Sequence, residues 1–121
     1  MDKNRFLKSF VYAYEGIKHG YKNGQNIIVM TFLGAIAIIL SFVFKITYIE
    51  KLIIILLIAI ILPLELINTA IEATVDLHDE NKKSANGKIA KDCASGALLI
   101  ASIMALIIGM IIFMPHIIKL F

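Results

Sequence analysis

The chain has 121 residues, of which 60% are hydrophobic and 17% are charged, and its formal net charge is +3. A soluble domain is usually about 45–50% apolar and about 25% charged. The excess of apolar residues excludes a disordered chain, a nucleic-acid-binding tail and an ordinary soluble enzyme, and the length excludes a large transporter with internal repeats. The composition therefore predicts a small integral membrane protein, with too few helices to enclose a site unless it oligomerises.

The first segment, residues 3–22, has the pattern of an amphipathic helix. Its apolar side chains recur every three or four residues, at Phe6, Phe10, Ala13, Ile17 and Tyr21. Its polar side is basic and carries Lys3, Arg5, Lys8, Lys18 and Lys22. Either Asp2 or Asn4 is a candidate cap for the first turn. A basic amphipathic helix beside a membrane span is expected to lie in the membrane interface, and a soluble surface helix is the alternative.

Two apolar segments follow. Residues 27–44 contain no charge and are long enough to cross a bilayer. After a short connection at 45–51, residues 52–78 form a second predicted span, which Pro63 should bend because it removes one backbone hydrogen bond. The last part of this helix, 65–78, is polar along one side, and we expect it to extend to the cytoplasmic interface.

A polar connection is predicted over residues 79–91, with Asn86-Gly87 as its turn. Residues 93–114 then form the third span, which Pro115 is expected to end. Small residues recur along one stripe of this span and favour close helix packing in lipid; they are Ala94, Ala97, Ala101 and Ala105. We therefore expect one membrane domain over residues 1–121, built from a surface helix and three transmembrane helices.

The 12 Lys and Arg residues are unevenly distributed about these spans. Five precede the first span and four lie between the second and the third, which leaves three for the two segments on the opposite side. Because cytoplasmic segments are enriched in Lys and Arg, the N-terminus and the 79–91 connection are expected in the cytoplasm. The polar end of the second span would then face the compartment that holds ATP.

Five polar residues share one face of the second span when its sequence is drawn as a helix; they are Glu65, Asn68, Thr69, Glu72 and Asp76. We call this set the acidic stripe. An ionisable residue at the centre of a membrane helix costs about 2.5–3.5 kcal/mol on insertion scales, and less near the interface. The acidic stripe is therefore expected to face protein, water or a ligand rather than lipid.

Four interpretations of the acidic stripe are open from its chemistry. Its acids could pair with Lys or Arg of another helix during assembly. Alternatively, carboxylates and an amide on one face suit Mg²⁺, which often shares such ligands with nucleotide phosphates. An acid near an apolar boundary is also a candidate general base for a lipid hydroxyl, because desolvation disfavours its charged form. A proton or ion pathway is less favoured, because no polar residue continues the path through Leu52–Pro63.

The acidic stripe contains a recognisable motif. Residues 65–72, Glu-Leu-Ile-Asn-Thr-Ala-Ile-Glu, followed by Asp76, resemble the E-x-x-N-[ST]-A-x-E-x-x-x-D signature of the prokaryotic diacylglycerol kinase family. Residues 90–92, Ala-Lys-Asp, followed by Ser95, resemble the family's A-K-D segment at the start of its last span. Three residues of the surface helix also fit the family spacing: Arg5, Tyr12 and Gly16. The resemblance covers nearly the whole chain.

The resemblance implies an all-α integral membrane fold, with an N-terminal surface helix and three transmembrane helices, assembled as a homotrimer. It implies transfer of the γ-phosphoryl group of ATP to a membrane lipid alcohol, with Mg²⁺ as the cofactor. By analogy, Glu65 would be the general base for the lipid hydroxyl, oriented with help from Asn68. Glu72 would bind Mg²⁺, and Ser95 would lie near the lipid end of the site. The residues that would contact ATP are Arg5, Tyr12, Asp76, Lys91 and Asp92.

The chain departs from the family pattern at Gly24 and Met30, where the family carries a second metal-binding Glu and a His. Glycine has no side chain with which to bind a metal. Mg²⁺ could then be held by Glu72, ATP phosphates and water, or the chain could be a non-catalytic membrane assembly protein that kept the kinase fold. If the missing acid weakens metal binding, Gly24→Glu should lower the Mg²⁺ concentration needed for activity.

Two lipid alcohols, undecaprenol and diacylglycerol, are candidate acceptors. The short N-terminus, the Asn68-Thr69-Ala70 form of the motif and Asn26 resemble the Gram-positive members of the family, which mainly phosphorylate undecaprenol. Undecaprenol is therefore the expected substrate and diacylglycerol the alternative. The expected location is the bacterial cytoplasmic (inner) membrane, and no nucleic-acid partner is expected.

Overall fold

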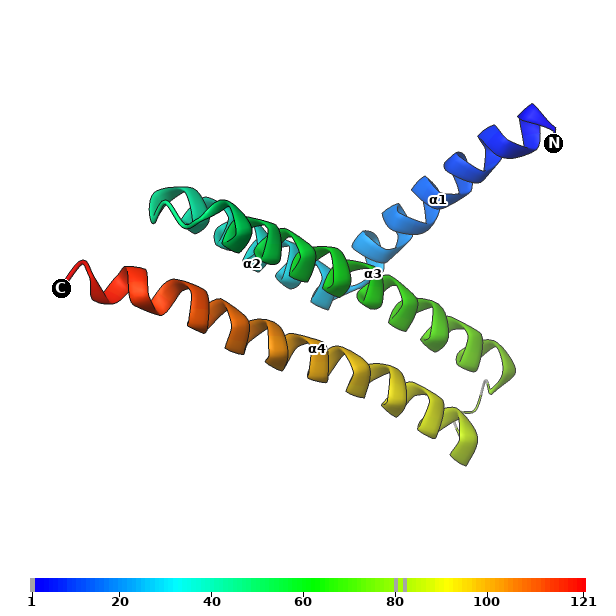
Figure 1. The fold of residues 1–121 in the computed structure, drawn as a ribbon. Coiled ribbons are helices and arrows are strands. Elements are labelled where there is room, and N and C mark those ends of the chain that lie inside the picture. Colours follow the sequence, from blue (N-terminus) through cyan, green and yellow to red (C-terminus); the bar gives the residue numbers. More distant parts are fainter. Residues whose placement is uncertain (1, 80, 82) are drawn as a thin grey trace.

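The computed structural model describes residues 2–79, 81 and 83–121, apart from the side chain of Gln25, and within these ranges it contains four helices and no strand. The helices are α1 (Lys3–Asn23), α2 (Gln25–Val43), α3 (Tyr48–His78) and α4 (Ala85–Ile118), shown in Figure 1. Of these, α2, α3 and α4 are long and apolar enough to cross a membrane. The predicted all-α membrane fold is therefore confirmed.

Two helices begin where short polar side chains cap them. The carboxylate of Asp2 accepts a hydrogen bond from the backbone N–H of Asn4, 3.0 Å away, at the start of α1. At the start of α3, the Thr47 hydroxyl and the Glu50 carboxylate each accept a bond from the other residue's backbone N–H. Because this capping box precedes the apolar run, α3 begins at Tyr48, four residues before the predicted start at residue 52.

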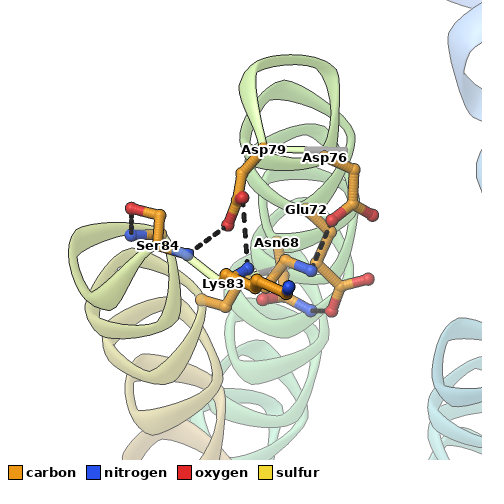
Figure 2. A network of polar contacts seen from close by, with 8 residues as sticks. Asn68, Glu72, Asp76, Asp79, Lys83 and Ser84 are labelled. Atoms are coloured by element: carbon orange, nitrogen blue, oxygen red, sulfur yellow. Dashed lines mark hydrogen bonds and ion pairs between the residues drawn. The ribbon is translucent and has the colours of Figure 1, made fainter. Parts of the chain in front are cut away.

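The connection between α3 and α4 is shorter than the sequence predicted. Asp79 accepts hydrogen bonds from the backbone N–H groups of Lys83 and Ser84, and the Ser84 hydroxyl accepts one from Gly87 N–H (Figure 2). The Ser84 cap starts α4 at Ala85, and the Asp79 bonds hold the connection that leads to it. The turn predicted at Asn86-Gly87 is wrong, because both residues belong to the first turn of a helix that Ser84 caps.

The two prolines do not end the helices that contain them. α3 continues through Pro63 to His78, and α4 continues past Pro115 to Ile118. A proline removes only its own N–H from the ladder, and membrane helices tolerate this loss. The carbonyl of Pro115 still accepts a hydrogen bond from the backbone N–H of Lys119, 3.3 Å away. The prediction that Pro115 ends the third span is therefore wrong by about one turn.

The three long helices form a layer with α3 in the middle. α2 and α4 each pack against α3, and within the described residues their backbones do not approach one another, although the ring of Phe44 at the end of α2 lies 6.2 Å from that of Phe113 on α4. The buried apolar cluster of Ile46, Ile54 and Ile112 lies at the end of this layer away from the acidic stripe. An open apolar groove of about 530 Å³ lies between α2 and α4 and is also lined by α3. The many exposed apolar side chains suit a protein surrounded by lipid or by further chains.

α1 projects away from this layer, and only its C-terminal end is held (Figure 1). Gly20 is buried against α3, where a Cβ would meet the terminal Cδ2 of Leu66, so a larger residue here requires the Leu66 side chain to move. The Tyr21 and Thr31 hydroxyls are 2.6 Å apart and join α1 to α2. These contacts fix the elbow between the two helices, while residues 3–19 remain exposed.

Candidate active site

The acidic stripe lies on the C-terminal half of α3, where its first two residues are buried and its later residues are partly or fully exposed. Glu65 is only 4% exposed and Asn68 8% exposed, although the chain is a single copy. Thr69 and Asp76 are half-buried, and Glu72 is exposed. Figure 2 shows Asn68, Glu72 and Asp76 arranged along one side of α3. The stripe therefore connects a buried carboxyl group with a carboxylate that a water-soluble ligand can reach.

The amide of Asn68 is fixed by its neighbour on the next turn. Its Nδ2 donates a hydrogen bond to Oε1 of Glu72, 3.3 Å away (Figure 2). In this orientation Oδ1 of Asn68 is buried and is the one such side-chain atom of the described residues that lacks a hydrogen-bond partner. An unpaired buried acceptor costs about 1–3 kcal/mol, so its retention indicates a donor that is absent from the single chain. A substrate hydroxyl would be such a donor.

An ion pair joins the acidic stripe to α4. Lys91 Nζ lies 2.5 Å from Oδ1 of Asp76, and the Lys91 side chain is 29% exposed. Asp92 instead pairs with Lys88 on α4 itself, where both side chains are well exposed. The structure therefore brings Lys91 and Asp76 together from two helices and places Asp92 one residue away along α4.

The pairing of α3 with α4 also fixes which residues of the two helices lie opposite one another along the helix axes. Asp76 pairs with Lys91 at one end, and Glu50 lies 3.5 Å from His116 at the other. These contacts are 26 residues apart on α3 (76 to 50) and 25 apart on α4 (91 to 116), so the helices run antiparallel in one register. In that register Ser95 lies level with Glu72.

The same register places Ser102 level with Glu65. Ser102 is half-buried, and it is the only polar residue among the described residues that line the apolar groove. Unlike the hydroxyl of Thr69, which donates to the main-chain carbonyl of Glu65 at 3.1 Å, its hydroxyl makes no hydrogen bond within the described chain. Sequence reasoning missed Ser102, although a lone hydroxyl in the apolar run of α4 was visible.

The two predicted ATP-binding residues of α1 do not join the others within one chain. Arg5 and Tyr12 are exposed on the projecting part of α1. Within the described residues α1 contacts α2 and α3 but not α4, which carries Lys91. Where α1 approaches α3, a cavity of about 470 Å³ is lined by residues that include His19 and Thr69. One copy of the chain therefore supplies only part of the predicted site.

Glu72 is the residue best placed to bind a metal ion. Within the described ranges, no group of three or more His, Cys, Asp or Glu side chains is arranged to hold one. Mg²⁺ does not require such a group, because it is usually bound by one or two carboxylates together with substrate phosphates and several waters. The exposed Glu72 carboxylate fits this role, whereas Asp76 is already paired with Lys91.

Gly24, which stands where the resemblance expects an acid, is part of the α1–α2 elbow. It follows the last residue of α1 and precedes the first of α2, and its N–H donates to the Gly20 carbonyl at 2.8 Å. A Cβ on Gly24 would lie 2.8 Å from that same carbonyl oxygen. Any side chain at this position therefore requires the elbow to shift.

The family model and the three known proteins that match this chain are all described as kinases. A model of the prokaryotic diacylglycerol kinase family matches residues 11–113. The chain is 41% identical to the undecaprenol kinase of Bacillus subtilis over 112 residues, which cover 93% of this chain and 90% of the relative. It is 35% identical to a diacylglycerol kinase of Synechocystis, over 94% of this chain and 65% of the relative. It is 32% identical to a diacylglycerol kinase of Haemophilus influenzae, over 88% of this chain and 91% of the relative.

Proposed function

Because the chain belongs to the prokaryotic diacylglycerol kinase family, we propose that it transfers the γ-phosphoryl group of ATP to a membrane lipid alcohol, with undecaprenol as the acceptor. The observation that carries this proposal is the arrangement of Glu65, Asn68 and Glu72 along one face of α3 in a chain that matches this family over most of its length. The three residues connect a buried base to an exposed metal ligand. Phosphoryl transfer to a lipid needs both a buried and an exposed group, because the lipid alcohol comes from the membrane and ATP comes from water.

Glu65 acts as the general base in this proposal. The alcohol oxygen attacks the γ-phosphorus, the bond from that phosphorus to the bridging oxygen of ADP breaks, and the alcohol proton passes to the Glu65 carboxylate. Burial at 4% exposure keeps water away from this carboxylate. The hydroxyl has a single proton, so it donates first to the unpaired Oδ1 of Asn68, one turn away, as the alcohol enters, and then to Glu65 as the proton is transferred. Ser102, level with Glu65, is a further contact for the acceptor.

The exposed end of the acidic stripe binds the nucleotide. Glu72 would hold Mg²⁺ together with ATP phosphates and water. When bound, the metal neutralises charge on the transferring phosphoryl group. Lys91 supplies a point charge to the phosphates from its position against Asp76. Arg5, Tyr12 and Asp92 complete the proposed ATP contacts.

A homotrimer accounts for the separation of α1 from α4. Arg5 and Tyr12 project from the layer of long helices and do not reach Lys91 in their own chain, so we assign them to the site of a neighbouring copy. This arrangement is tested by mixing subunits. An Arg5→Ala chain and a Glu65→Gln chain, each inactive alone, should recover part of the activity when assembled together. No recovery in mixed trimers of verified composition would show that each site uses residues of one chain.

We also propose the orientation and location of the protein. The N-terminus, the α3–α4 connection and the exposed end of the acidic stripe face the cytoplasm, because nine of the 12 Lys and Arg residues lie on that side. ATP is available there. The membrane is the cytoplasmic (inner) membrane of a bacterium.

Diacylglycerol remains the second candidate acceptor, because two of the relatives described above are named diacylglycerol kinases. Purified protein with radiolabelled ATP, Mg²⁺ and each lipid in turn decides between them. We expect faster transfer to undecaprenol, and loss of transfer to both lipids in Glu65→Gln. A folded oligomer that phosphorylates neither lipid would instead identify a non-catalytic assembly protein, the alternative that Gly24 suggests.

A further inference from the structure

One hydrogen bond crosses the elbow between α1 and α2. The hydroxyl oxygens of Tyr21, in the last turn of α1, and Thr31, in the second turn of α2, lie 2.6 Å apart, and both residues are half-buried. The Thr31 hydroxyl donates its own proton to the backbone carbonyl of Ile27 at 2.7 Å, so Tyr21 is the donor between the two helices. Among the residues that the structure describes, no other side-chain hydrogen bond or ion pair joins α1 to another helix. The bond therefore ties the helices together across Gly24, the one residue between them.

The packing of α1 on α3 does not by itself fix the direction of α1. A cavity of about 470 Å³ lies between the two helices and is lined mainly by small and apolar side chains of both. Beside it, Gly20 faces the terminal carbon of Leu66, a side chain that can change its rotamer. A membrane surface, on which the sequence predicts that α1 lies, limits the tilt of the helix but not its rotation about the membrane normal. Because a hydrogen bond is directional, the bond between Tyr21 and Thr31 is the contact best suited to set this rotation.

A small rotation at the elbow moves the far end of α1 by several ångströms. Arg5 lies 19 residues and Tyr12 lies 12 residues before Gly24, which at 1.5 Å a residue is about 28 Å and about 18 Å. A rotation of about 10° would therefore displace Arg5 by about 5 Å and Tyr12 by about 3 Å. Figure 1 shows the first turns of α1 extending away from α2, α3 and α4. Because direct hydrogen bonds are about 2.7–3.2 Å long, such a displacement would break a contact that Arg5 makes with a phosphate.

We propose that Tyr21 and Thr31 are positioning residues for the ATP end of the site: their hydrogen bond fixes the direction of α1 and so determines where Arg5 and Tyr12 are presented. The inference rests on the proposed function, which assigns Arg5 and Tyr12 to ATP in a neighbouring copy. Both hydroxyl protons are already donated within the chain, one to Thr31 and one to Ile27. The pair therefore acts through α1 and not by donating to a substrate.

Steady-state kinetics test the positioning role. Tyr21→Phe and Thr31→Val each remove the bond while keeping the shape of the side chain, so each should raise KM for ATP by about 2- to 10-fold, the equilibrium value of one hydrogen bond, and leave KM for the lipid unchanged. The double variant Tyr21→Phe/Thr31→Val should raise KM for ATP no further, because both changes remove the same bond. Tyr14→Phe is the control: it removes an exposed hydroxyl of α1 that makes no hydrogen bond within the described chain, and KM for ATP should not change. Additive effects of the two elbow substitutions, or an equal rise in Tyr14→Phe, would contradict a shared positioning bond.

The direction of α1 is also measured without any activity. In liposomes, spin labels on Ser9→Cys and on the exposed Cys93 report the distance between α1 and α4, and dilution with unlabelled Cys93→Ser chains limits the signal to one copy. We expect one narrow distance distribution with the unaltered elbow and with Tyr14→Phe, and a broader or shifted one with Tyr21→Phe or Thr31→Val. Unchanged distributions in both elbow variants would overturn the proposal even in an active kinase. A broader distribution in a chain that transfers no phosphate would support the elbow bond as the contact that directs α1 and would refute the proposed function instead.

Discussion

If the Asn68 amide is retained for the proposed chemistry at a cost to the fold, Asn68→Leu should stabilise the protein while it lowers activity. Asn68 is 8% exposed, and its Oδ1 has no partner in the chain. Removing an unpaired buried acceptor recovers about 1–3 kcal/mol. The substitution also removes the bond from Nδ2 to Oε1 of Glu72, which is long at 3.3 Å and is worth about 0.5–1.5 kcal/mol. The expected net change is a stabilisation of about 1 kcal/mol.

Thr69→Val is the matched control for this substitution. Thr69 lies in the same stripe, and its hydroxyl already donates to the Glu65 carbonyl. The change is nearly isosteric and relieves no unpaired group, so it should not raise the free energy of unfolding. Comparing the two variants therefore separates relief of an orphan acceptor from a general gain in apolar character.

The assay pairs unfolding in mixed micelles, titrated with a denaturing detergent, with initial rates of transfer to undecaprenol. Asn68→Leu should unfold at higher denaturant and should lose about 100-fold or more in rate, the loss typical when an acid–base arrangement is disrupted. A destabilised Asn68→Leu would show that the amide serves the fold. A stabilised variant that keeps full activity would show that Oδ1 does not meet the substrate.

Three further predictions concern the surroundings of the acidic stripe. Lys91→Met should raise KM for ATP more than Lys88→Met, because Lys91 is held against Asp76 whereas Lys88 pairs with Asp92 in an exposed position; equal KM values would remove Lys91 from the nucleotide site. Gly24→Ala and Gly24→Glu should both lower the melting temperature, because a Cβ there meets the Gly20 carbonyl at 2.8 Å, but only Gly24→Glu should lower the Mg²⁺ concentration for half-maximal rate. An unchanged Mg²⁺ requirement would show that the metal site is completed elsewhere. Ser102→Ala should raise KM for the lipid by about 2- to 10-fold, the value of one hydrogen bond, without changing KM for ATP; a change in KM for ATP alone would contradict the register that places Ser102 level with Glu65.

The sequence predicted the number and character of the helices because apolar runs and helical spacing are local properties. It also placed the acidic stripe on one face of α3, since that face follows from helix geometry alone. The start of α4 was missed because Asn86-Gly87 was interpreted as a turn, although Ser84 caps the helix before it. A serine cap and a turn dipeptide compete at this point, and only the hydrogen bonds decide between them.

The contacts between helices at the site could not be predicted from the sequence. The pairing of Lys91 with Asp76 depends on the register between α3 and α4, and no local pattern encodes that register. Ser102 became a candidate for the same reason. The separation of Arg5 from α4 depends on the direction in which α1 leaves the elbow, which the contacts of Gly20 and Tyr21 set. Residue identity therefore predicted the chemistry of the site, and helix packing determined how much of it one chain can assemble.

The proposed phosphoryl transfer is tested most directly by following radiolabelled γ-phosphate from ATP to undecaprenol in liposomes, with the unaltered chain and with Glu65→Gln. We expect Mg²⁺-dependent formation of undecaprenyl phosphate by the unaltered chain and none above background by a Glu65→Gln variant with an unchanged unfolding transition. Equal product from the two proteins, or none from either with undecaprenol or diacylglycerol, would contradict the assignment of Glu65 and of the acidic stripe to phosphoryl transfer.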